Sequence, residues 1–449
     1  MAGCRRFAEF SNISSDLVPV FIPSRKDIIL HHCKTSAIFR GMEPRIRNSL
    51  RTQSSAGHFS PPDSSPGPGV AVIFGSFLHL GITAFGGPAM IAHIKEMSVI
   101  RNKWLNEETF KDGVVICQSL PGATAMQMAA YVGLRVNGVR GAIASYAGFG
   151  LPAFLLMLAL AVFYSGSRMM PLVVSLFRGL QVIVVAILAN ATFAFGRDIG
   201  KKPMNLVLAG VAAVLFGLGV TPFGVIVGAA LAGGLMFKDP ATPPPSDKKD
   251  GDAGHVPGPI VVFMILACAG IIGLYIADRK LYQLAAMMLR IDLFAFGGGF
   301  ASLPLMFHEI VNVRGWMDGR TFMDGIALGQ VTPGPIVITA TFVGYLVHGF
   351  PGALVATLAI FTPSFVVLIA ATPFFDRLRS ARYFSSTTRG ILASFVGLLF
   401  YMTIRFAAAV PWDAVKILFG VAALVALAKK GNILHVVLVG SVLSILVFR

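Results

Sequence analysis

The chain carries the pentapeptide Ala-Phe-Gly-Gly-Pro at residues 84–88 and Ala-Phe-Gly-Gly-Gly at residues 295–299. Each copy is followed by the same ordered set of residues: a tryptophan, a Thr-Phe pair, an Asp-Gly pair, a glutamine and a Pro-Gly pair. The copies are 211 residues apart at the glycines and 212 apart from the tryptophan to Pro-Gly, and the spacing returns to 211 at Gly141 and Gly352. The chain therefore contains a duplication of about 100 residues, with a slip of one residue.

Composition places the chain in a membrane. Its 449 residues are 55% hydrophobic and 13% charged, and the mean hydropathy is +0.75, so the chain has more apolar surface than a soluble domain buries. The net charge is +16, but the basic residues lie between apolar segments rather than beside stacking aromatics, so we expect no nucleic-acid partner. We also expect no metal and no other cofactor, because the four cysteines have neither disulfide nor ligand spacing: Cys4, Cys33, Cys117 and Cys268.

Residues 1–69 differ from the rest of the chain. They hold nine of the 37 basic residues, end in a stretch rich in Pro and Ser, and contain no signal-peptide core, so we interpret them as disordered. Three origins remain open: a cytoplasmic tail, an organelle transit peptide, or an over-extended reading frame whose true start is Met42. The acidic residues Glu9, Asp16 and Asp27 argue against a transit peptide, and we favour the start at Met42.

Hydropathy predicts an all-α polytopic membrane protein with about thirteen spans. A first membrane repeat is expected at 70–237 and a second at 278–449, with a polar linker at 238–258 and a lone span at 259–277 between them. The expected spans are 70–92, 113–134, 142–164, 171–195, 204–218, 221–237, 259–277, 281–306, 324–347, 352–375, 390–408, 414–428 and 433–448.

Basic residues in the connections orient these spans. With the N-terminus in the cytoplasm, the inside connections hold sixteen Lys and Arg residues and the outside connections nine, as the positive-inside rule requires. The main dissent is the first outside connection, which carries Lys95, Arg101, Lys103 and Lys111. Six spans on either side of the lone span give the two repeats opposite orientations, which predicts an inverted repeat in a plasma membrane of the bacterial inner-membrane type.

We interpret the paired interruptions as an anion site between broken helices. Backbone N–H groups at the N-terminus of a half-helix supply donors and a positive dipole end, and glycine allows close approach. Close helix packing is the alternative use of Gly and Pro in membranes, but the breaks recur in register, with a glutamine three residues before each proline, which favours the site. The candidate substrate-binding residues are Gly86, Gly87, Pro88, Gln118, Pro121, Gly122, Gly297, Gly298, Gly299, Gln330, Thr332, Pro333 and Gly334, with Ser119 and Thr124 as further side-chain donors.

Ionisable residues near the second glycine pair extend this list. A charge at the bilayer centre costs about 2.5–3.5 kcal/mol, so one that persists there faces a cavity or a partner. Arg290 is a candidate to bind the anion, and Asp292 and Glu309 are candidates to carry a coupling proton. Two alternatives stay open: Arg290 and Asp292 lie near the interface, where snorkelling removes most of the cost, and Glu309 is an ordinary surface acid.

The region from Val70 to Arg449 resembles the chromate ion transporter family in its long, two-half form. The resemblance rests on the Phe-Gly-Gly motifs at 85–87 and 296–298, each followed by the tryptophan, a polar segment and Gln-x-x-Pro-Gly. It implies export of chromate from the cytoplasm, with sulfate as the related oxyanion, coupling to the proton gradient, and chromate resistance. Two positions depart from the family pattern: Ala123, where the second repeat has Pro335, and Asp292, where such proteins carry a small residue.

Three other functional classes compete with this one. A passive anion channel would use the same donors without coupling acids, and an oxyanion carrier of the sulfate type would have a different main substrate. A membrane enzyme is disfavoured, because the chain has no HExxH, GxSxG or P-loop motif. The expected partners are the oxyanion, chromate or sulfate, and the lipid bilayer; the oligomeric state, a homodimer included, is left open.

Overall fold

A computed structural model describes residues 68–85, 89–167, 169–200, 203–237, 258–375, 383–429 and 431–448. The chain divides into two units, Met1–Pro66 and Gly67–Arg449, and everything below concerns the second. The predictions made for residues 1–67 and for the linker at 238–257 lie outside the described residues. So do Gly86, Gly87 and Pro88.

The described part of the chain is mostly helical and contains no strand, so the all-α class is confirmed. The first half consists of α2 (Val70–Thr83), α3 (Ala89–Lys95), the π-helix η2 (Glu96–Arg101), α4 (Glu107–Ser119), α5 (Thr124–Ser167), α6 (Pro171–Ile199), α7 (Pro203–Gly217) and α8 (Pro222–Met236). After α9 (Gly258–Ala277), the second half consists of α10 (Arg279–Phe294), α11 (Gly299–Phe307), the π-helix η3 (His308–Val313), α12 (Gly319–Val331), η4 (Ile336–Ile338), α13 (Thr339–Ala371), η5 (Thr372–Phe374), α15 (Phe384–Ala409), α16 (Ala414–Ala428) and α17 (Ile433–Val447).

The two halves repeat one another in their local structure. Asn106 caps α4 by accepting the Thr109 N–H at 2.8 Å, and Asp318 caps α12 by accepting the Thr321 N–H at 2.8 Å. The long helices α5 and α13 are each kinked at a glycine with positive φ, +58° at Gly138 and +60° at Gly349. Each kink separates a short first segment from a long second segment of the helix.

The helix breaks at Pro-Gly turn the chain back on itself. Gly113 of α4 lies against the ring of Tyr131 in the first segment of α5, and the Tyr131 hydroxyl donates to the Thr109 carbonyl at 3.2 Å. In the second half Gly325 of α12 lies against the ring of Phe342 in the same way. The segments 113–134 and 324–347, expected as single spans, are therefore helical hairpins, because proline and glycine between the two arms allow the reversal.

The chain also turns back between each glycine break and the hairpin that follows it. Phe307 at the end of α11 stacks on Phe322 of α12, at 5.7 Å between ring centroids, and on Phe406 near the end of α15, at 5.0 Å. At the end of α3, Lys95 bonds Glu107 at the start of α4 at 2.8 Å, which lowers the pKa of that carboxyl. The expected spans 70–92 and 281–306 are each interrupted, because α2 ends at Thr83 before α3 begins at Ala89, and α10 ends at Phe294 before α11 begins at Gly299.

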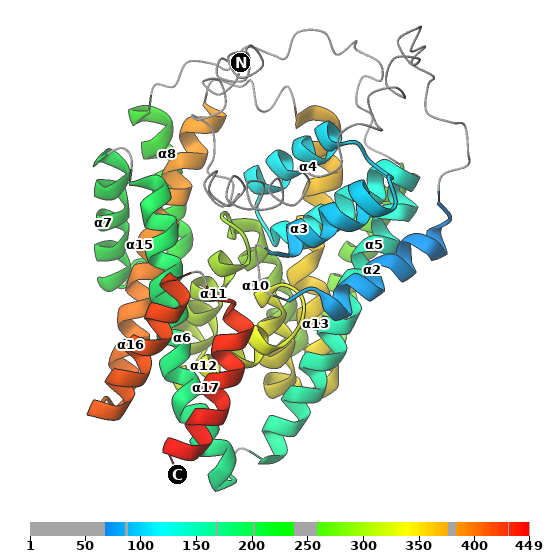
Figure 1. Ribbon diagram of the computed structural model, residues 1–449. Coiled ribbons are helices and arrows are strands. Elements are labelled where there is room, and N and C mark those ends of the chain that lie inside the picture. Colours follow the sequence, from blue (N-terminus) through cyan, green and yellow to red (C-terminus); the bar gives the residue numbers. More distant parts are fainter. Residues whose placement is uncertain are drawn as a thin grey trace, which may run out of the picture. The chain divides into compact units, whose positions relative to one another are not determined.

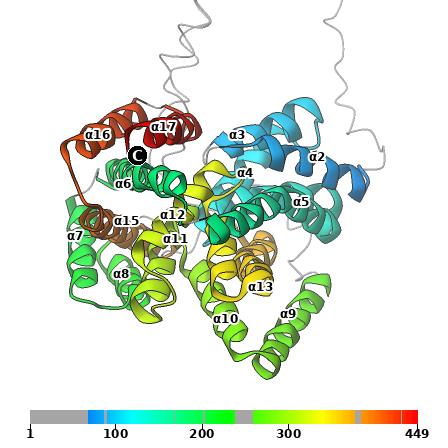
Figure 2. The same cartoon turned by 90° about the horizontal axis from the view of Figure 1, so that it is seen from below.

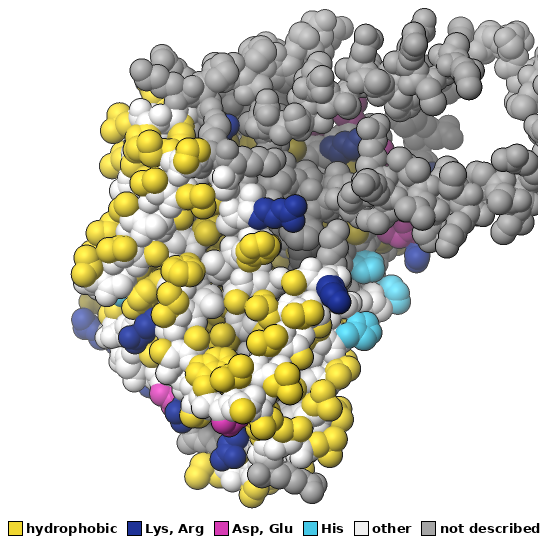
Figure 3. All heavy atoms as spheres, turned by 60° about the vertical axis from the view of Figure 1, so that its left-hand side comes forward, with side chains coloured by type: hydrophobic (Ala, Val, Ile, Leu, Met, Phe, Trp, Pro, Cys, Tyr) yellow, Lys and Arg dark blue, Asp and Glu magenta, His cyan; other side chains and the backbone are white. Residues whose placement is uncertain are grey.

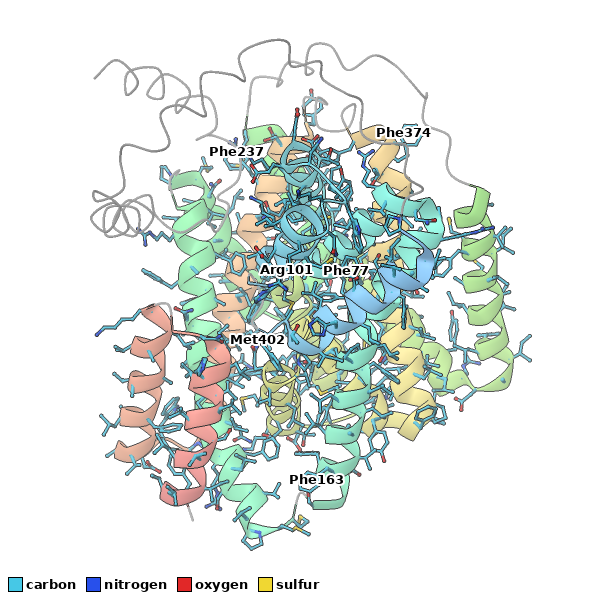
Figure 4. All side chains as sticks on the ribbon, turned by 45° about the vertical axis from the view of Figure 1, so that its right-hand side comes forward. Phe77, Arg101, Phe163, Phe237, Phe374 and Met402 are labelled. Atoms are coloured by element: carbon cyan, nitrogen blue, oxygen red, sulfur yellow. The ribbon has the colours of Figure 1, made fainter. Side chains whose placement is uncertain are left out.

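The hairpins of the two halves enter from opposite ends of the long helices. Asn137, at the kink of α5, donates to the Pro68 carbonyl before α2 at 3.1 Å, whereas Tyr164, near the other end of α5, donates to Asp324 of α12 at 2.8 Å. Figure 4 places Phe237 and Phe374 at one end of the helices and Phe163 at the other. The halves are therefore inverted relative to one another, as the sequence predicted.

Four helical segments are long and apolar enough to cross a membrane by length and composition: Thr124–Ser167, Pro171–Arg197, Ile336–Phe374 and Phe384–Ala409. The apolar helices α7, α8, α16 and α17 have 15 residues each, about 22 Å against the ~30 Å of a bilayer core. Counting apolar segments therefore does not give the number of helices that cross the membrane completely. Figure 1 shows these helices as shorter rods beside α6 and α15.

The short helices of each half pack against a long helix of the other half. In the view of Figure 2, α16 and α17 of the second half lie beside α6, and α7 and α8 of the first half lie beside α15. Ser444 of α17 accepts the Gly179 N–H of α6 at 3.0 Å, and Gly233 of α8 lies against Gly390 of α15. Since Gly179 and Gly390 are equivalent residues, each half completes the other.

The outer face of these helices is apolar. Side chains such as Val211 and Val214 of α7 and Leu418 and Val421 of α16 are exposed. Figure 3 shows hydrophobic side chains over most of the face that these elements form, with few charges among them. Such a contiguous apolar surface fits contact with lipid rather than with water.

Candidate functional site

The four breaks meet in two reciprocal pairs. The Gly122 N–H donates to the Ala295 carbonyl at 3.0 Å, and the Gly334 N–H donates to the Ala84 carbonyl at 3.2 Å. Gly122 and Gly334 are equivalent residues, as are Ala84 and Ala295, so one contact is the copy of the other. Reciprocal contacts of this kind define a pseudo-two-fold relation between the halves. We call the meeting point of the breaks the junction.

Two helix N-termini from different halves converge at the junction. Thr124 begins α5 and Gly298 precedes α11, and a Cβ added to Gly298 would lie 3.3 Å from Oγ1 of Thr124. The first turn of a helix has N–H groups without intrahelical acceptors and carries the positive end of the helix dipole. Gly298, at φ +89°, has a conformation that L side chains rarely adopt. Thr124 and Gly298 were both predicted to supply donors, and the structure brings them together.

Asp292 lies beside the junction and is buried. Its Oδ2 accepts the backbone N–H of Ser364 at 2.7 Å, and a Cβ added to Gly122 would lie 3.3 Å from its Oδ1. In the first half the equivalent residues are Gly81 and Ala153, which have no polar side chain. The carboxylate therefore occurs in one half only.

Gln127 and Ser364 join the site although they were not among the predicted residues. The Gln127 amide donates to the Pro121 carbonyl at 2.6 Å and to the Ser364 carbonyl at 3.4 Å, so it holds the tip of the first hairpin against α13. The Ser364 hydroxyl lies 3.1 Å from the Tyr146 hydroxyl. Ser364 directly follows Pro363, the equivalent of Pro152, and this register was the one sequence signal that pointed to it.

Several residues at or next to the breaks have buried polar atoms without a hydrogen-bond partner in the described chain. They include Oδ1 of Asp292, Oε1 of Gln127 and Nε2 of Gln330. Unpaired buried polar groups are costly and rare in folded proteins. An unpaired amide donor on Gln330 and first-turn N–H groups suit a ligand with several acceptor oxygens.

The other predicted residues fall into two groups. Pro121, Pro333 and Gly334 are buried in the hairpin tips, and the buried Thr332 hydroxyl donates back to the Gly329 carbonyl at 3.0 Å. The half-buried residues are Gln118 in α4 and Gly297 and Gly299 at the second glycine break.

Arg290 forms an ion pair with Glu309 rather than with Asp292. The buried Glu309 carboxylate accepts from the guanidinium groups of both Arg290 and Arg314, one on each oxygen. These residues line a cavity of about 520 Å³ with His308, Phe223 and Thr221. The predicted anion-binding arginine and the predicted proton carrier thus belong to one cluster, which we call the clamp (Arg290, Glu309 and Arg314).

A second cavity, of about 940 Å³, opens where α5 ends and α12 begins. Its buried carboxylate is Asp324, which accepts from the Tyr164 hydroxyl and from the Gln181 amide, both at 2.8 Å. Arg178 and Arg320 also line this cavity. Asp324 belongs to the repeated Asp-Gly motif, but its partners come from the other half and carry no motif of their own.

Comparison with known proteins identifies the family. A family model described as chromate transporter matches residues 71–234 and 282–445, one match for each half. An uncharacterised transporter of Methanocaldococcus jannaschii is 43% identical over 384 residues, which cover 85% of this chain and 95% of that protein. A chromate transport protein of Pseudomonas aeruginosa is 30% identical over 431 residues, which cover 90% and 98%. One of Cupriavidus metallidurans is 28% identical over 325 residues, which cover 72% and 79%. No solved structure matches the chain.

Proposed function

This chain belongs to the chromate transporter family, and from that membership we propose that it is a secondary active carrier that exports chromate from the cytoplasm through the junction. The observation that carries the proposal is the convergence of the N-termini of α5 and α11, from different halves, beside Gly122 and Ala295. A carrier with inverted halves binds its substrate where broken helices meet, because only there can both halves contact it.

The junction suits a tetrahedral oxyanion. Backbone N–H groups and an amide donor lose little on reorganising when they exchange water for an anion, and the helix dipoles add positive potential. Such donors recognise the charge and shape of an oxyanion rather than its central atom, so we include sulfate as a second substrate. Discrimination between chromate and sulfate then depends on the size of the space around Gly122 and Gly298.

The direction of transport follows from charge. A dianion that leaves a cytoplasm held 100 mV negative gains about 4.6 kcal/mol, since each charge contributes ~2.3 kcal/mol. The membrane potential alone therefore favours export. A proton bound at Asp292 would neutralise the one carboxylate beside the junction, so proton and anion binding support each other.

The hairpins support a cytoplasmic N-terminus. The connection between η2 and α4 lies at the same end of the helices as the start of α2, which brings Lys95, Lys103 and Lys111 to the N-terminal side. The connection before α12 lies at the other end. The dissenting charges of the simple span count thus join the side that the positive-inside rule assigns to the cytoplasm.

The test is uptake of radiolabelled chromate into inverted vesicles that contain the full chain. We expect uptake when the vesicle interior is positive, competition by sulfate but weak competition by larger oxyanions, and loss of uptake when valinomycin and potassium collapse the potential. Nigericin, which collapses only the pH gradient, isolates the proton contribution. Equal chromate uptake by vesicles without the protein would rule out the proposal.

A further inference from the structure

The clamp is built from residues that bind anions. Two guanidinium groups from different elements, α10 and the segment after η3, converge on the single carboxylate of Glu309. The side chain of Glu309 is 5% exposed, whereas those of Arg290 and Arg314 are 46% and 23% exposed. The acid is thus fixed in the protein while both bases border the cavity of about 520 Å³.

We propose that Arg290 and Arg314 form a second oxyanion site, which Glu309 occupies in this structure as an internal substitute for the ligand. The proposal rests on the proposed function, because the ligand is the same class of tetrahedral dianion. A carboxylate and an oxyanion present similar oxygen pairs to a guanidinium fork, so the donors that hold Glu309 also fit sulfate or chromate. When the anion enters, the arginines turn from Glu309 to it.

The charge and the volume of the clamp cavity favour an anion. Two guanidinium groups and one carboxylate leave the clamp with one net positive charge, and His308 lines the same cavity without a carboxylate partner of its own among the described residues. The volume far exceeds the ~30 Å³ share of one water molecule, so the cavity has room for a hydrated oxyanion.

The clamp occurs in one half only. The equivalents of Arg290, Glu309 and Arg314 in the first half are His79, Met97 and Asn102, which cannot form it. A structural ion pair needed for the repeated fold would be expected twice. The single copy therefore points to a task in transport rather than in folding.

The position of the clamp couples it to both halves. The Arg290 guanidinium stacks on the ring of Phe223, which belongs to α8 of the first half, at 4.4 Å from its centroid. Arg290 also stands two residues before Asp292 on the last turns of α10. Relative movement of the halves therefore changes the surroundings of Arg290.

The test compares binding of radiolabelled sulfate to the purified full chain in detergent. If Glu309 competes with the anion, Glu309→Gln should raise the affinity about tenfold, whereas Arg290→Gln and Arg314→Gln should lower it about tenfold or more. Glu107→Gln is the matched control. Glu107 is an exposed carboxylate paired with Lys95, so its substitution removes the same charge at a place away from the cavity. Sulfate affinity that stays unchanged or falls in a folded Glu309→Gln protein overturns the proposal.

Two further variants keep the result decisive. Arg290→Lys and Arg314→Lys retain the charge and lose the planar fork, so we expect folded proteins with reduced sulfate affinity, and wild-type affinity in both would contradict the site. The double variant Gly298→Ala and Glu309→Gln separates the clamp from the junction, since it should still bind sulfate. Failure of wild-type chromate uptake would refute the proposed function alone, and failure of the Glu309→Gln effect would refute the clamp alone.

Discussion

The hydroxyl oxygens of Thr192 on α6 and Thr403 on α15 lie 3.3 Å apart, and these two residues are equivalents of one another in the two halves. Each also donates to the carbonyl four residues earlier, that of Leu188 or Leu399, at 2.8 Å. Equivalent residues can touch only where a two-fold axis passes between them. The pseudo-two-fold axis of the molecule therefore passes between α6 and α15 at this point.

A cysteine pair tests this axis. In a chain with its native cysteines replaced by serine, Thr192→Cys with Thr403→Cys should form an intramolecular crosslink on oxidation, detected by a mobility shift. The control pair is Thr192→Cys with Thr388→Cys, whose second cysteine lies about 22 Å away along α15. Equal crosslinking of the two pairs would contradict the predicted contact.

The glycine break is tested by two substitutions with the same backbone cost. Gly298 has φ +89° and Gly219, in the turn before α8, has φ +83° with nothing near an added Cβ. Gly298→Ala and Gly219→Ala should each lower stability by about 1–2 kcal/mol, because alanine resists positive φ. Only Gly298→Ala should lose chromate uptake, measured at equal amounts of folded protein; equal loss in both would make the break a packing feature.

Two substitutions of Asp292 separate its structural role, the hydrogen bond with Ser364, from its proposed role in proton binding. Asp292→Asn keeps an oxygen that can accept the Ser364 N–H, so we expect near-normal thermal stability, chromate uptake that persists, and loss of its response to nigericin. Asp292→Ala leaves that N–H unpaired and should cost about 1–3 kcal/mol of stability. A nigericin response that survives in Asp292→Asn would move the proton site elsewhere.

Tyr164 should anchor the second hairpin. Tyr164→Phe removes the donor to Oδ2 of Asp324 and leaves a buried carboxylate oxygen with one partner fewer, which should cost about 1–3 kcal/mol. The measurement is the thermal unfolding midpoint in detergent. Tyr146→Phe, which removes a hydroxyl bonded to the Phe361 carbonyl and Ser364, serves as a comparison in the same helix. Unchanged stability in Tyr164→Phe would mean that the hairpin does not depend on this bond.

The sequence predicted the places of the breaks better than the path of the chain through them. Glycine and proline mark where a helix must end, so the breaks before Gly122, Gly298 and Gly334 follow from residue chemistry. Hydropathy does not record whether the chain continues or turns back. The contact of Gly113 with Tyr131 decides that, and only the folded chain contains it.

The site was likewise predicted in part. Thr124 and Gly298 were chosen because they flank breaks, and they meet. Arg290 and Asp292 were grouped by proximity along the chain, but they lie on different sides of α10 and have different partners, Glu309 and Ser364. Partners contributed by the other half, such as Gln127 and Tyr164, carry no local pattern, because their role depends on tertiary contacts across hundreds of residues.

The single carboxylate beside the junction has a kinetic consequence. In a carrier with inverted halves, each half adopts the shape of the other as the protein changes from inward-open to outward-open. Identical halves would give the two states equal free energy and equal affinity. Asp292 and Ser364 stand where the first half has Gly81 and Ala153, so the two states cannot be mirror images. The half-saturating concentration of anion should therefore differ on the two membrane faces even when no gradient is applied.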